Sequence, residues 1–122
     1  MKKILLLMSF LAIIQFGYAQ IRSVKILEDK ISYNDDKEAS VLFSLENTSS
    51  KEVTSIEFLF AWGASYEDFT APTVRKNVKV SINPKSKNSI TVYVPEAKKH
   101  LVPIRRISIM WVRFTDGSIE SI

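Results

Sequence analysis

The chain has 122 residues, a formal net charge of +4, only three glycines and no cysteine. This length allows one small domain, and the missing cysteine excludes disulfides, Cys–His chemistry and a lipid-modified N-terminal cysteine. A small domain without disulfides has to be held together by packing, which favours a well-packed sheet protein over a loop-rich scaffold.

The first nineteen residues have the pattern of a secretory signal peptide. A positively charged start, MKK, precedes an apolar run at 4–14 and the small-x-small cleavage motif Gly17-Tyr18-Ala19. The apolar run is shorter than the roughly 20 residues needed to span a bilayer. We therefore expect residues 1–19 to be cleaved and residues 20–122 to be exported to the periplasm or medium of a bacterium, with no membrane or lipid anchor.

Period-two alternation of apolar residues predicts most of the mature chain to be β-strand. The predicted strands, in chain order, cover about 23–33, 40–46, 56–62, 78–82, 90–94, 105–115 and 118–122. Turn-forming residues separate them, and Asn47 is expected to accept a hydrogen bond from the backbone two residues further on. Pro95 predicts the start of one short helical turn, and Asp116-Gly117 predicts a tight turn.

The last long strand is apolar on both faces. Ile107, Ile109 and Trp111 alternate on one face, and Met110, Val112 and Phe114 occupy the other. This pattern is expected of a central strand covered on two sides, or of a strand that crosses a bulge. We expect the strand aromatics to form the core: Trp62, Trp111, Phe58, Phe60 and Phe114.

Seven short strands without a long helix predict an all-β fold. We expect a single antiparallel β-sandwich of the immunoglobulin-like type over residues 20–122, with an OB-like or other small barrel as the alternative. The segment FSLENTSSKEVTSIEFLF, residues 43–60, resembles bacterial immunoglobulin-like modules of the FxLYD kind, and VRFTDGS, residues 112–118, is similar to their closing hairpin. The resemblance implies a sandwich module without catalytic residues.

Candidate catalytic groups are few. His100 is the only histidine, which excludes a multi-histidine zinc site, and no G-x-S-x-G elbow or phosphate-binding glycine loop is present. We expect His100 to be exposed at the end of a turn. Asp35-Asp36 is expected to be solvated, with a weak calcium site as the alternative. The expectation is no enzyme, no cofactor and no metal.

Basic residues are concentrated in one part of the chain. Residues 21–74 contain five basic and ten acidic residues, whereas residues 75–113 contain ten basic residues and one acid, Glu96. An anionic envelope component, an acidic glycan or an acidic protein would suit such a region better than nucleic acid. The alternative is that these side chains protect edge strands from aggregation. The candidate patch comprises Lys76, Lys79, Lys98, Lys99, Arg105 and Arg106.

A second candidate surface is the segment 63–72, which lacks strand periodicity. Tyr66 and Phe69, beside Trp62, are candidates for an exposed recognition loop, unless they fold over the end of the sandwich. Three functions remain open: a non-catalytic module that binds a protein or envelope component, an accessory subunit that pairs through an edge strand, and a small hydrolase.

Overall fold

The computed structural model describes residues 21–63 and 72–122; the expected signal peptide, Tyr66 and Phe69 lie outside them. The described residues form the strands β1 (Val24–Tyr33), β2 (Ala39–Asn47), β3 (Val53–Ala61), β4 (Thr73–Ile82), β5 (Lys87–Val94), β6 (Arg106–Phe114) and β7 (Ile119–Ser121), and the 3₁₀ helix η1 (Pro95–Lys99). The all-β prediction is confirmed, although β4 begins at Thr73 and not at Val78.

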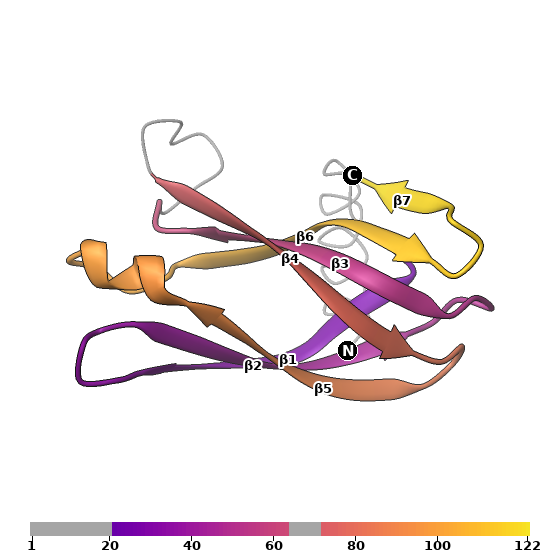
Figure 1. Cartoon of the computed structure of the whole chain (residues 1–122), viewed down its shortest axis with the longest axis horizontal. Helices are drawn as coiled ribbons and strands as arrows, with labels where there is room; N and C mark the ends of the chain where they lie inside the picture. The colour runs from indigo at the N-terminus through magenta and orange to yellow at the C-terminus, as the bar shows by residue number, and fades with distance from the viewer. Residues whose placement is uncertain (1–20, 64–71) are drawn as a thin grey trace, which may run out of the picture.

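The strands form two antiparallel sheets that face each other (Figure 1). One sheet has the order β1-β2-β5, and the other has the order β4-β3-β6-β7. The chain changes sheets at the β2–β3, β4–β5 and β5–β6 connections. Since most strands carry apolar residues on one face only, the two inner faces enclose a single core, and the fold is a β-sandwich.

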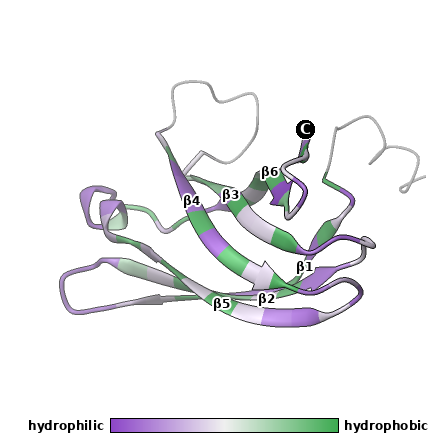
Figure 2. Ribbon diagram, turned by 45° about the vertical axis from the view of Figure 1, so that its right-hand side comes forward, coloured by the Kyte–Doolittle hydropathy of each residue, from purple (hydrophilic) through white to green (hydrophobic). Residues whose placement is uncertain are grey.

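Three phenylalanines occupy the centre of this core. The ring of Phe43 in β2 stacks on that of Phe58 in β3, with centroids 4.4 Å apart and 14° between the planes. Phe60 lies 6.3 Å from both rings, and all three side chains are fully buried. Apolar and polar residues alternate along β4, so its apolar side chains also face this core (Figure 2). The core therefore joins the two sheets through aromatic contacts.

Asn47, at the end of β2, is fully buried and organises two turns. Its Oδ1 accepts a hydrogen bond from the backbone N–H of Ser49 at 3.0 Å, which confirms the predicted turn. Its Nδ2 donates to the backbone carbonyls of Lys51 at 2.7 Å, Ile82 at 3.0 Å and Asn83 at 3.2 Å. Because these hydrogen bonds use the whole amide, its burial is compatible with a stable core.

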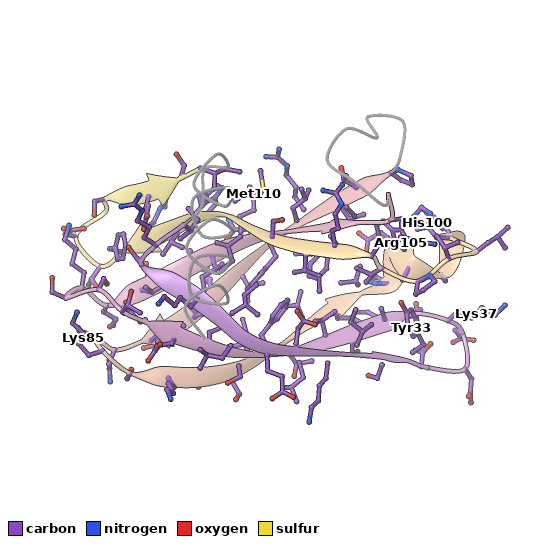
Figure 3. The ribbon with its side chains drawn as sticks, turned by 180° about the vertical axis from the view of Figure 1, so that it is seen from behind. Tyr33, Lys37, Lys85, His100, Arg105 and Met110 are labelled. Carbon is purple, nitrogen blue, oxygen red and sulfur yellow. The ribbon has the colours of Figure 1, made fainter. Side chains whose placement is uncertain are left out.

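A bulge in β6 changes which of its residues face the core. Glu57 of β3 pairs with Trp111, whereas the next residue, Phe58, pairs with Ile109, so Met110 is the extra residue. Figure 3 shows Met110 pointing outward from its sheet. Of the two explanations predicted for this strand, the bulge is confirmed.

Because of the bulge, apolar residues both before and after it in β6 face the core. Ile109 before it and Val112 after it both face inward, and both belong to the core. Trp111 is consequently half-buried on the outer face, where the guanidinium of Arg113 lies 5.8 Å from the centre of its ring. The prediction that Trp111 belongs to the core is wrong.

Glu120 of β7 joins the start of the described chain to the opposite sheet. Its carboxylate accepts hydrogen bonds from the backbone N–H groups of Arg22 at 2.9 Å and Ser23 at 3.1 Å, and from the Ser23 hydroxyl. Burial raises the pKa of the Glu120 carboxyl, but these hydrogen bonds outweigh burial and hold it below the ordinary value of 4.5. Ionised Glu120 therefore connects the residues before β1 to the four-stranded sheet.

Candidate functional site

The sandwich has two ends of different character. We call one the turn end, formed by the β2–β3, β4–β5 and β6–β7 turns, and the other the η1 end, formed by the β1–β2 turn and the β5–β6 connection. Figure 3 shows Lys85 at the turn end, and Tyr33, Lys37, His100 and Arg105 at the η1 end. Loops at the ends of a rigid sandwich are a common location for binding surfaces.

Polar groups of the turn end are engaged with one another. Lys51 Nζ lies 2.9 Å from Asp116 Oδ2, and Asp116 also accepts hydrogen bonds from the backbone and hydroxyl of Ser118. These contacts, first with Ser118 and then with Lys51, hold the pKa of the Asp116 carboxyl well below its usual range. Gly117 closes this turn with φ of +86°, a backbone conformation that favours glycine. This end is therefore a hydrogen-bonded closure of the sandwich.

At the η1 end, the short helix begins at Pro95 as predicted and ends at Lys99, with His100 as its C-cap. The backbone N–H of His100 donates to the carbonyl of Ala97 at 3.1 Å. The imidazole stacks on Trp62, with ring centroids 4.1 Å apart. His100 is half-buried by this contact, so the prediction of an exposed histidine is wrong. Trp62 is 4% exposed and belongs to the core, so its ring provides no exposed recognition surface.

The three residues after His100 form an apolar protrusion, residues 101–103, which we call the tip. Leu101 is fully exposed and Val102 is 42% exposed. Beyond the tip, Ile104 is buried, and its backbone N–H donates to the hydroxyl of Tyr33 at 3.1 Å. The tip is thus held on one side by the His100–Trp62 stack and on the other by Ile104.

Cationic side chains surround the tip. Lys98, Lys99, His100 and the tip itself line a shallow hollow of about 310 Å³, to which Lys37 of the β1–β2 turn contributes from the other side. Arg105 is exposed directly after Ile104. The described carboxylates at this end lie outside the lining: Asp35, Asp36, Glu38 and Glu96.

The β1–β2 turn is shaped by Asn34. Its Oδ1 accepts hydrogen bonds from the backbone N–H groups of Asp36 at 3.0 Å and Glu38 at 2.9 Å, and Lys37 between them has φ of +65°. Glu38 Oε2 lies 3.7 Å from Lys98 Nζ. The pKa of the Glu38 carboxyl is lowered chiefly by a hydrogen bond from Tyr93, then by Asn34. One lysine of the hollow thus has an acidic neighbour.

The residues of the predicted basic patch do not all share one surface. Lys98, Lys99 and Arg105 are brought together at the η1 end. Arg106 starts β6, and its Nε donates to the carbonyl of Gly63 at 3.0 Å. Lys79 is exposed on the outer face of β4. Sequence reasoning missed Lys37 and the tip, although the run KKHLVPIRR at 98–106 does show apolar residues between cations.

Lys76 has a different environment from the other patch residues. It alternates with Val74 and Val78 in the row of β4 that faces the other sheet, and its Nζ lies 2.7 Å from Glu96 Oε2 in η1. This hydrogen bond is the main cause that lowers the pKa of the Glu96 carboxyl. Lys76 therefore joins β4 to η1, and an inward charge on an edge strand opposes strand addition.

Two further observations concern residues 21–63 and 72–122. They contain no group of three or more His, Cys, Asp or Glu residues that could hold a metal ion. No helix formed by them is long and apolar enough to cross a membrane.

The fold and the η1 end together define a small β-sandwich with an apolar tip among cationic side chains. No protein-family model matches the chain, and no curated protein matches it. Its function has therefore to be inferred from the residues and geometry of the sandwich itself.

Proposed function

We propose that this protein is an exported, non-catalytic β-sandwich module of the immunoglobulin-like type that binds an anionic component of the bacterial cell envelope through its η1 end. The immunoglobulin-like assignment is supported by the strand order, in which β2 lies beside β5 and β3 beside β6. These are the neighbours that the corresponding strands have in immunoglobulin sandwiches. Export is supported by the signal-peptide pattern of residues 1–19.

One observation carries the binding proposal: Lys37, Lys98 and Lys99 converge from two separate connections on one hollow whose described lining contains no carboxylate. A concave surface lined by one sign of charge raises the local concentration of ligands of the opposite sign. The turn end differs in degree, because its Lys51 lies 2.9 Å from Asp116, whereas Lys98 at the η1 end lies 3.7 Å from Glu38.

Assembly through an edge strand has less support. The edge strand β1 is interrupted by a register shift between Ile26 and Glu28, and the edge strand β7 has three residues. The edge strand β4 carries Lys76 on its inner row, whereas the fourth edge strand, β5, pairs with β2 without a register shift. Bulges, short strands and inward charges are the features that prevent a sheet edge from accepting another strand.

Binding of the mature chain to a soluble polyanion, dextran sulfate, tests the proposal. All seven strands lie within residues 24–121, so the chain from Gln20 contains the whole sandwich. The double variant Lys98→Gln/Lys99→Gln should bind roughly 30-fold more weakly, because each lysine near an anionic surface contributes about 1 kcal/mol. Binding should also weaken with salt, since exposed charges are screened.

The matched control is Lys25→Gln/Lys87→Gln. Both lysines are exposed, and the control changes the net charge equally, but they lie near the turn end, Lys25 at the second position of β1 and Lys87 at the first position of β5. Its affinity should change by less than about twofold if binding is local to the η1 end. Equal losses in the two double variants would show that binding follows net charge alone, and the proposed site would then be rejected.

Export has a separate test. The full-length chain produced in a bacterium should be recovered from the periplasm or medium with Gln20 as its first residue, as determined by N-terminal sequencing. Recovery of an uncleaved chain with Met1 from the cytoplasm would contradict export without bearing on the η1 end.

A further inference from the structure

We propose that the tip, residues 101–103, inserts into an anionic lipid bilayer while the surrounding cations contact lipid phosphates. This inference rests on the proposed function and names its anionic ligand as a membrane surface. The binding would be peripheral and reversible, since it uses a few apolar side chains and a basic ring.

The apolar side chains of the tip are exposed to solvent. A fully exposed leucine alone is ordinary on a protein surface. Here, however, Leu101, Val102 and Pro103 are consecutive and all exposed. A rigid partner would need a preformed complementary surface to bury these exposed side chains, whereas a bilayer deforms around them. Burial of a leucine and a valine side chain in the acyl boundary is favourable.

The tip is held in place by contacts on both sides before it meets a partner. On one side, the His100 ring stacks on the buried Trp62 at 4.1 Å. On the other, Ile104 is buried and its N–H donates to the Tyr33 hydroxyl at 3.1 Å, and the N–H of Arg105 donates to the carbonyl of Ala61 at 2.9 Å. Little ordering is then needed on binding, which reduces its entropic cost.

The basic side chains near the tip are complementary in charge to lipid phosphates. Lys98 and Lys99 precede it, Arg105 follows it, and Lys37 approaches from the β1–β2 turn across the hollow. Such clustered cations attract the phosphates of an anionic leaflet, and this attraction falls off within about a Debye length of the surface. Apolar side chains at the centre of such a ring are therefore brought to the depth at which they can insert.

The absence of cysteine allows a direct measurement of insertion. Leu101→Cys, labelled with an environment-sensitive NBD fluorophore on the mature chain, should show a blue shift and a several-fold increase in emission with vesicles of phosphatidylglycerol and phosphatidylcholine. Pure phosphatidylcholine vesicles should produce no change. The matched control is Ile122→Cys, because Ile122 is also exposed, at 50%, but is joined through its N–H to Met110 of β6.

A second variant tests the tip without a label. Leu101→Asn should reduce co-sedimentation with phosphatidylglycerol vesicles roughly tenfold, because the apolar contribution of one leucine is lost. Its affinity for dextran sulfate should remain within about twofold of the wild type, because no charge is changed. Circular dichroism of Leu101→Asn should match the wild type, since the side chain makes no buried contact.

The outcomes separate the two proposals. A label at Leu101 that stays in an aqueous environment while the protein sediments with anionic vesicles would overturn tip insertion and leave electrostatic binding intact. Binding to dextran sulfate without binding to vesicles would overturn it as well. If the wild-type protein binds neither dextran sulfate nor anionic vesicles, the proposed function itself is overturned.

Discussion

The Nδ2 of Asn47, at the end of β2, donates a hydrogen bond to the carbonyl of Ile82, at the end of β4, at 3.0 Å. This contact joins the two sheets, because β2 and β4 belong to different sheets. The same amide also donates to Lys51 and Asn83. One side chain therefore couples two turns and both layers of the sandwich.

Asn47→Ala should lower the free energy of unfolding by about 3 kcal/mol, because it leaves the buried carbonyl of Ile82 and the part-buried carbonyls of Lys51 and Asn83 without this donor. Asn47→Asp should be at least as damaging, since a carboxylate would face the same carbonyls. Urea denaturation followed by circular dichroism measures both. The control is Asn77→Ala, an exposed position of β4, which should change stability by less than about 0.5 kcal/mol.

Glu120 should make stability depend on pH in a defined direction. Its pKa is lowered in the folded state, so the unfolded chain binds more protons as the pH falls. The stabilisation is therefore fully present above about pH 4.5 and is lost as the pH falls through the lower pKa of the folded state. Glu120→Gln lacks this titration. The difference in unfolding free energy between wild type and variant should therefore be largest near pH 7 and shrink below pH 4.5. A difference independent of pH would contradict the role of the ionised carboxylate.

Truncation of two neighbouring residues of β2 should destabilise the protein to very different extents. Phe43 is fully buried and stacked on Phe58, so Phe43→Ala should cost about 3–5 kcal/mol through lost burial and the cavity left behind. Leu42 is 46% exposed on the other face, so Leu42→Ala should cost less than about 1 kcal/mol. Similar losses at both positions would contradict the side-chain orientation of β2.

Lys76→Val should promote self-association, because it converts the inner row of the edge strand β4 into an uninterrupted series of valines at 74, 76, 78 and 80. It also removes the partner of Glu96. Size-exclusion chromatography with light scattering measures the outcome. Lys79→Val removes one charge from the outer face of the same strand and should remain closer to monomeric. Identical behaviour of the two variants would argue against the protective role of Lys76.

Much of this fold could be predicted from local patterns. Alternation with period two depends only on the strand itself, so the inward positions Val41, Phe43 and Leu45 follow directly from the sequence. Trp111 could not be placed in this way. The bulge at Met110 is created by the pairing of β6 with β3, and a one-residue shift reverses every side chain that follows it.

For the candidate site, the cations close together in sequence were predictable as a group. Lys98 and Lys99 line one hollow, and Arg105 lies at the same end of the sandwich (Figure 3). Lys37 reaches the same hollow from the β1–β2 turn, and Lys76 is withdrawn from it by its ion pair with Glu96. Both outcomes depend on which distant connections the two sheets bring to the same end.

By itself, the sequence determined the strands, the Asn47 turn, the start of η1 and the need to form a core without disulfides, because these follow from side-chain alternation, local hydrogen bonding and composition. Only the tertiary structure decided the order of the strands, the outward position of Trp111, the contact of half-buried His100 with Trp62 and the exposure of Leu101. The physical reason is that register, stacking and burial are set by partners far away in the chain, which local patterns do not specify.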